Sequence, residues 1–263
     1  MPIPIYQVDA FTAEPYRGNP AAVCLLDKAA DEGWMQDVAA EMNLSETAFI
    51  FPEGDGYRLR WFTPKSEVKL CGHATLATAH VLFREKGVAQ DRPIKFYTLS
   101  GLLTAGLADG MIELDFPASP VVACEAPPGL AGALGVRPVF VGRGDDDYLV
   151  EVATEEEVRE AAPDFATLVK APCRGVILTA LSRSGEYDFV SRFFAPAVGV
   201  AEDPVTGSAH CRLVPYWQAK LKKDGFTAYQ ASARGGFLKV AARGGRVSIA
   251  GHAVTVFAGG LRA

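Results

Sequence analysis

The chain is organised around the segment Val68-Lys-Leu-Cys-Gly-His-Ala-Thr-Leu-Ala-Thr-Ala-His-Val-Leu-Phe-Arg-Glu-Lys-Gly87. It predicts a strand end, a tight glycine turn and an alanine-rich helix that ends at Gly87, a residue free to adopt the left-handed cap conformation. Because this helix is small and apolar on several sides, we expect other structure to enclose it. Its first turn offers unpaired backbone N–H groups beside Cys71, Gly72 and His73, and such a helix end attracts anions.

Composition narrows the class of protein. The 263 residues are 49% hydrophobic and 22% charged, as in a soluble globular protein, and the net charge of −5 argues against a nucleic-acid partner. The N-terminus lacks the features of a signal peptide and no apolar run could cross a bilayer, so we predict a cytoplasmic protein with no membrane partner. The five cysteines are widely spaced without a C-x-x-C pair, which predicts neither a disulfide framework nor a zinc module.

An internal repeat relates the two halves of the chain. Arg60-Trp-Phe-Thr-Pro64 recurs as Arg192-Phe-Phe-Ala-Pro196, and Gly72-His-Ala74 recurs as Gly207-Ser-Ala209 at a slightly larger offset. The change of offset predicts a short insertion in the second copy, around 202–206.

The repeat predicts an N-terminal half over 1–117, a linker over 118–137 that is rich in Pro, Ala and Gly, and a C-terminal half over 138–263. If the halves face each other, both helix N-termini meet at one cleft, where small molecules commonly bind and where an anion such as a carboxylate is favoured. The first half contributes one acid, Glu46, that has no match in the second half. This asymmetry indicates a single proton-transfer group.

Four motifs are similar to those of the PhzF-like family, the phenazine-biosynthesis isomerases and their relatives. They are Gly18-Asn-Pro-Ala-Ala22, Asn43-Leu-Ser-Glu-Thr-Ala-Phe49, Leu70-Cys-Gly-His-Ala-Thr75 and Glu202-Asp-Pro-Val-Thr-Gly-Ser-Ala209. They occur in the family's order and span essentially the whole chain. The resemblance implies a diaminopimelate epimerase-like α/β (α+β) fold of two pseudo-symmetric halves, each a mostly antiparallel sheet curled around a central helix, with the active site between them.

The same resemblance implies a cofactor-independent isomerase or epimerase that shifts a proton on a small carboxylate-bearing metabolite, in a protein that forms homodimers. Glu46 would shuttle the proton, His73 and Asp203 would assist it and hold the substrate, and the polar end of the substrate would be lined by Ser45, Gly72, Gly207 and Ser208.

Cysteine and metal chemistry are weighed against this interpretation. Related epimerases use two cysteines that face one carbon, but an ungapped alignment of the halves sets Asp203 opposite Cys71, which disfavours a two-thiol racemase. His80 follows His73 on roughly the same helix face, yet no further ligand has suitable spacing, so no metal is predicted.

Each candidate residue also has a simpler interpretation. Glu46 could satisfy N–H groups of a turn, Asp203 could be a turn residue before Pro204, and Ser208 could be a helix N-cap. Cys71 could be a small buried residue. Two other functions therefore stay open: a non-catalytic small-anion-binding or interaction protein that retains the fold, and an enzyme that depends on Cys71.

Overall fold

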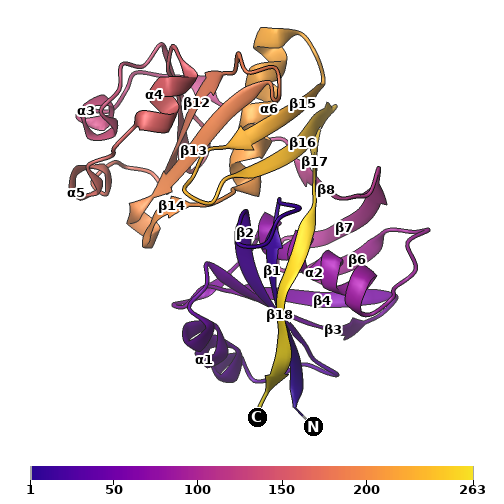
Figure 1. Ribbon diagram of the computed structural model, residues 1–263. Coiled ribbons are helices and arrows are strands. Elements are labelled where there is room, and N and C mark those ends of the chain that lie inside the picture. The colour runs from indigo at the N-terminus through magenta and orange to yellow at the C-terminus, as the bar shows by residue number, and fades with distance from the viewer. Residues whose placement is uncertain (1, 263) are drawn as a thin grey trace. The chain divides into compact units, whose positions relative to one another are not determined.

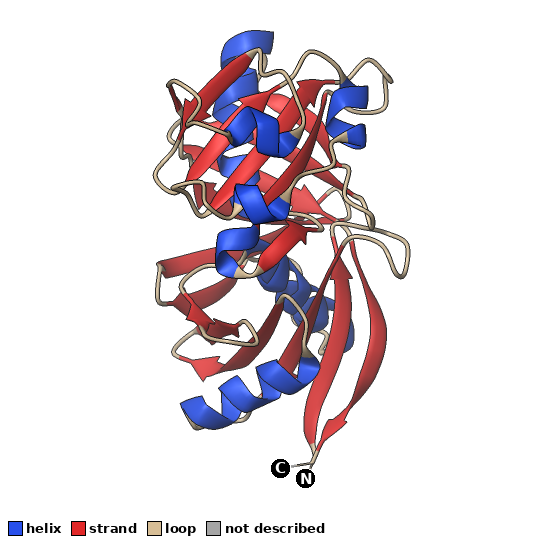
Figure 2. Ribbon diagram, turned by 90° about the vertical axis from the view of Figure 1, so that its left-hand side faces the viewer, coloured by secondary structure: helices blue, strands red, loops and turns tan. Residues whose placement is uncertain are grey.

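The computed structural model describes residues 2–262, which form two units (Figure 1). The first unit comprises Met1–Asp115 with Ile249–Ala263, and the second comprises Phe116–Ser248. This division differs from the predicted halves, because the last strand belongs to the first unit and the predicted linker belongs to the second. Both units are built mainly from strands (Figure 2).

The first unit encloses helix α2 (Gly72–His80), as the sequence predicts. Residues His73 to Ala79 are all buried, and the helix contacts β1, β2, β3, β7 and β18. Pairing is mainly antiparallel, with parallel pairs β2–β3 and β4–β6. The strands are β1 (Ile3–Ala10), β2 (Asn19–Leu25), β3 (Glu46–Glu53), β4 (Gly56–Phe62), β5 (Glu67–Val68), β6 (Ile94–Thr98), β7 (Gly101–Ala108), β8 (Met111–Pro117) and β18 (Ala253–Leu261).

The polar side chains inside α2 are satisfied locally. The hydroxyls of Thr75 and Thr78 donate to the carbonyls of Cys71 and Ala74 at 2.5 and 2.7 Å, so neither residue needs water. The helix continues as a π-helical turn, η1 (Val81–Glu85), and the chain then turns at Gly87, whose φ of +65° confirms the predicted cap conformation.

Helix α1 (Glu32–Met42) packs on a second core of this unit with Phe49 and Phe62. Asp31 is the N-cap and accepts from the backbone N–H of Trp34 at 3.0 Å, and Asn43 ends the helix in the left-handed conformation. The chain then enters β3 directly at Glu46.

The second unit has helix α6 (Gly207–Leu221) as its long helix, most of whose first eight residues are buried. Its strands pair in parallel at β11–β12 and β13–β15 and in antiparallel at β9–β10, β10–β11, β12–β13, β13–β14 and β15–β16. They are β9 (Val122–Ala123), β10 (Phe140–Arg143), β11 (Asp147–Glu151), β12 (Gly175–Leu181), β13 (Phe189–Ala195), β14 (Val200–Asp203), β15 (Gly225–Gln230), β16 (Gly236–Arg243) and β17 (Arg246–Gly251).

Three short helices complete the second unit: α3 (Leu130–Leu134), α4 (Glu155–Glu160) and α5 (Phe165–Leu168). They pack on an apolar cluster that includes strands β11 and β12. The 3₁₀ turn η2 (Pro196–Val198) follows β13. Within residues 2–262, none of the helices combines the length and apolar character needed to cross a bilayer.

The internal repeat is visible in matching ion pairs. Arg60 on β4 binds both carboxylate oxygens of Glu67 at 2.7 Å, and Arg192 on β13 binds both oxygens of Glu202 at 2.7 and 2.9 Å. In each unit the pair ties a long strand to the short strand that leads into the long helix. Such bidentate ion pairs fix geometry as well as contributing energy. Both units therefore use the same kind of ion pair to position the N-terminus of their helix.

Gly18 should tolerate no side chain. Its φ is +63°, and a Cβ would lie 2.1 Å from the carbonyl oxygen of Ala10. Gly87 has a similar φ of +65°, but no atom of the described chain lies within 4 Å of its Cβ position. We expect Gly87→Ala to lower the free energy of unfolding by about 1 kcal/mol, through backbone strain alone. Gly18→Ala should lower it by about 3 kcal/mol or more, because that substitution adds a steric clash to the same backbone strain. Urea unfolding of both variants measures the difference, and equal losses would contradict it.

Candidate functional site

The first unit brings Glu46 and His73 together. Glu46 is the first residue of β3 and His73 the second of α2, and the Glu46 Oε2 atom lies 3.2 Å from His73 Nε2. The side chain of Glu46 is 18% exposed and that of His73 is 6% exposed, so a carboxylate at the edge of solvent faces a ring inside the core. Ser45 and Gly72 directly precede these two residues in the chain, and their contact with a substrate stays a prediction.

The other nitrogen of the His73 ring faces two further groups. Nδ1 lies 3.1 Å from Asn19 Nδ2 and 3.6 Å from Cys71 Sγ. Asn19 is completely buried at the start of β2. Asn19 belongs to the motif Gly18-Asn-Pro-Ala-Ala22, which by itself assigns it no role. The signal that could have found it is its position between Gly18 and Pro20.

Burial keeps the His73 ring neutral. Loss of hydration lowers the pKa of His73 to about 3, so the ring carries no charge at neutral pH. Among residues 2–262, no group forms a hydrogen bond with His73 Nε2, although the atom is buried. Leaving such a group unsatisfied costs about 1–3 kcal/mol. A ligand oxygen beside Glu46 would relieve that cost.

Glu46, Cys71 and His73 are also types of residue that bind metals, and their ligand atoms lie within 4.8 Å of one another. The carboxylate approaches Nε2 while the thiol approaches Nδ1. The closest approaches of the two groups are thus to different ring nitrogens. That the site holds no metal stays a prediction.

In the second unit, Asp203 is held at the end of β14 by a buried network. The hydroxyl of Thr206 donates to its carboxylate at 2.5 Å. The Gln230 side chain donates to the Asp203 carbonyl at 2.8 Å and to the Thr206 hydroxyl at 3.0 Å, and accepts from the Thr206 N–H at 2.8 Å. Gln230 is completely buried, which makes this network a rigid support for Asp203.

Two details of the sequence analysis are corrected here. The N-cap residue of α6 is Thr206, so Ser208 lies inside the first turn and is not an N-cap. Cys71 is the N-cap residue of α2, so its counterpart is Thr206 and not Asp203. The ungapped alignment failed because it ignored the insertion that precedes α6. The position that would hold a second thiol carries a hydroxyl.

An arginine cluster beside the start of α6 was missed. Asp147 is fully buried and pairs with Arg174 at 2.5 Å and with Arg212 at 3.3 Å. Arg174 also donates to the Ser208 hydroxyl at 3.2 Å, so a guanidinium lies beside Gly207 and Ser208. No local pattern marks these partners, because they come from distant parts of the sequence.

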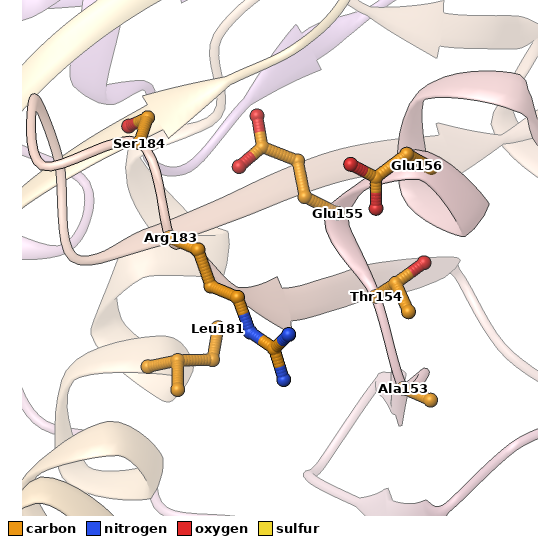
Figure 3. A pocket seen from close by; sticks show the side chains of 7 residues that line it. All are labelled: Ala153, Thr154, Glu155, Glu156, Leu181, Arg183 and Ser184. Carbon is orange, nitrogen blue, oxygen red and sulfur yellow. The ribbon is translucent and has the colours of Figure 1, made fainter.

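A separate surface hollow of about 390 Å³ lies in the second unit and contains none of the predicted site residues (Figure 3). The carboxylate of Glu155 in its wall is engaged by Arg159, Ser182 and Tyr187. This carboxylate is therefore committed to holding helix α4. The hollow is lined by Ala153, Thr154, Glu155, Glu156, Leu181, Arg183 and Ser184.

Known proteins are similar to this chain over almost its whole length. A family model described as phenazine biosynthesis-like protein matches residues 8–259. An uncharacterized isomerase from Halalkalibacterium halodurans is 56% identical over 257 residues, which is 97% of each chain. A crystal structure of a PhzF-family phenazine biosynthesis protein from Enterococcus faecalis is 43% identical, with a TM-score of 0.95 over 100% of both chains.

A probable proline racemase from Agrobacterium radiobacter is 13% identical, with a TM-score of 0.65 over 99% of this chain and 93% of the other. This likeness shows the fold alone. Together with the closer structure, it confirms the two-part α+β fold that the motifs predict.

The buried histidines should make stability depend on pH. His210 in α6 donates from Nδ1 to the Thr206 carbonyl at 2.8 Å, and burial lowers its pKa to about 4. The unfolded chain binds protons at histidine near pH 6.5, whereas folded His73 and His210 do not until much lower pH. Stability is therefore lost as pH falls from about 6.5 toward 4, by roughly 1 kcal/mol per pH unit for each ring.

Urea unfolding at pH 7, 6 and 5 tests this dependence. We expect His210→Gln to lose stability less steeply as pH falls, with the difference roughly equal to the contribution of one ring. The same substitution at exposed His252 is the control for the effect of the mutation itself. Equal slopes in wild type and His210→Gln would show that His210 does not resist protonation.

Proposed function

Because this chain belongs to the phenazine biosynthesis-like (PhzF-like) family, we propose that it is an isomerase that shifts a proton on a small carboxylate-bearing metabolite. The observation that carries the proposal is the Glu46–His73 pair of the first unit. A carboxylate lies 3.2 Å from a buried ring nitrogen that forms no hydrogen bond with residues 2–262. In this pair Glu46 would be the acid–base group, and the His73 ring beside it would be the hydrogen-bond donor.

In this mechanism the Glu46 carboxylate removes a proton from a carbon of the substrate. The electron pair of the broken C–H bond moves into the conjugated system or carbonyl of the substrate, where His73 Nε2–H stabilises the new negative charge. Glu46 then returns the proton to a different carbon or to the other face of the same carbon. Protons and electrons balance without a cofactor.

The second unit would bind the anionic end of the substrate. Backbone N–H groups at the start of α6 favour negative charge, and Arg174 adds a positive charge beside Ser208. Asp203, supported by Thr206 and Gln230, would accept a hydrogen bond from a substrate hydroxyl or amine. We propose that Gly72 and Gly207 face this substrate from the two helix ends. A cytoplasmic location and homodimer formation stay predictions.

A non-catalytic anion-binding protein is the alternative. The two helix N-termini and Arg174 would suffice for it, whereas Glu46 would repel the ligand. Binding of an acid that tightens in Glu46→Gln, with no turnover by wild type, would favour this alternative.

Loss of the Glu46 carboxylate should abolish turnover. The wild type is added to a small-molecule extract of bacteria in D₂O, and we expect one metabolite to isomerise or gain deuterium. With Glu46→Gln the same metabolite should react about 10²–10⁴-fold more slowly. Mass spectrometry and NMR measure both changes. The control is Glu53→Gln at the other end of β3, which removes a carboxylate paired with Arg58. The proposal would be contradicted if no metabolite in the extract isomerised or took up deuterium faster with the wild type than with Glu46→Gln.

Loss of the Cys71 thiol should matter far less. The Sγ atom contacts the ring edge of His73 that faces away from Glu46, so it takes no part in the proton transfer. We expect Cys71→Ser to keep the rate within about tenfold, since a hydroxyl still fits beside Nδ1. The same D₂O assay decides: a loss in Cys71→Ser without a loss in Glu46→Gln would establish the cysteine-dependent enzyme instead.

A further inference from the structure

The Asn19 side chain lies in a rigid setting beside the His73 ring. Gly18 before it takes a left-handed conformation at φ +63° in contact with Ala10, and Pro20 after it has a fixed φ. Asn19 is 0% exposed and pairs with Ala10 across β1 and β2. An amide held this firmly can impose an orientation on a neighbouring ring.

The hydrogen-bond chemistry of the two ring edges permits one arrangement. A carboxylate only accepts hydrogen bonds, so Nε2 at 3.2 Å from Glu46 is favourable when it carries the hydrogen. In a neutral imidazole the other nitrogen is then an acceptor. The Asn19 Nδ2 group, 3.1 Å from Nδ1, is a donor that matches it.

We propose that Asn19 is a positioning residue that holds His73 as the neutral Nε2–H tautomer, so that His73 is a fixed hydrogen-bond donor toward the substrate and never a second base. This inference rests on the proposed function, because it specifies the role of His73 in the same site. It divides the chemistry between two groups: Glu46 alone exchanges a proton, and His73 alone stabilises charge.

Protonation of the ring is opposed from several directions. An added hydrogen on Nδ1 would point at the N–H of Asn19, and Cys71 Sγ at 3.6 Å is a weak acceptor. His73 also lies in the first turn of α2, where the helix dipole disfavours a cation. Of the neighbours named here, Glu46 is the group that would favour the charged ring.

The chain provides its own reference for the experiment. Its histidines number four, and His210 donates from Nδ1 to the Thr206 carbonyl, so it holds the opposite tautomer. In protein labelled with ¹⁵N-histidine, NMR distinguishes bare from hydrogen-bearing ring nitrogens. We expect a bare Nδ1 in His73 and a bare Nε2 in His210 at pH 7, with the signals assigned by His73→Gln and His210→Gln.

Two substitutions separate the role of the amide from its size. Asn19→Asp presents an acceptor to Nδ1, and we expect Nδ1 of His73 to gain a hydrogen while His210 keeps its tautomer. Asn19→Leu has similar volume and no donor, and we expect a mixture of both His73 tautomers. Unchanged His210 signals report that the second unit is folded, and unchanged signals of His80 in α2, whose Nε2 lies 3.1 Å from the Thr255 hydroxyl, report that the first unit is folded.

The outcomes are distinct from those that test the proposed function. A hydrogen on Nδ1 in the wild type, or an unaltered His73 tautomer in both Asn19 variants, overturns the inference even if Glu46→Gln abolishes exchange. On the metabolite found with wild type, we expect kcat to fall about 10²-fold in Asn19→Asp, because the donor is misplaced by a change that leaves Glu46 intact. An altered tautomer with unchanged kcat overturns the functional role of Asn19.

Discussion

The complete enclosure of helix α2 is the constraint on which the rest of the first unit depends. A helix surrounded by strands must be narrow, and Ala74, Ala77 and Ala79 make it so. The two threonines within it satisfy their hydroxyls on the helix backbone. Because strands approach from several sides, the first turn loses its water as well. His73 is therefore dehydrated by the same packing that stabilises the unit.

A neutral His73 matters because of its neighbour. If the ring were charged, the attraction of an ion pair would favour the ionised Glu46 and weaken it as a base. Burial lowers the pKa of His73 and removes this attraction, while the proposed tautomer keeps an Nε2–H group that can donate to a substrate. A proton shift that develops negative charge on the substrate requires a base, here the proposed Glu46, and a hydrogen-bond donor, here the neutral His73 ring. The core thus supplies the electrostatics of the candidate site.

The sequence predicts features whose causes are local. Asp31, Asn43 and Gly87 mark helix ends because capping involves residues within one turn. The Asp109-Gly110 turn and the capping box at Thr154 have equally local causes. Pairing of β18 with β1 and of Arg174 with Asp147 depends on residues far apart in the chain, and no local pattern specifies such partners. Glu46 and His73 were found through motifs, whereas their separation could come only from coordinates.

The duplicated scaffold separates what the fold needs from what the chemistry needs. Both units keep the arginine–glutamate pair and the enclosed helix. Phe49 on β3 faces Arg60, and Leu178 on β12 faces Arg192, so the counterpart of Glu46 is Gly175. A Cβ at Gly175 would lie 2.4 Å from the Phe193 ring, which leaves no room for an acid there. Since the fold accepts a glycine at this position in one unit, packing does not explain the glutamate in the other. This contrast supports Glu46 as the proposed proton-transfer group.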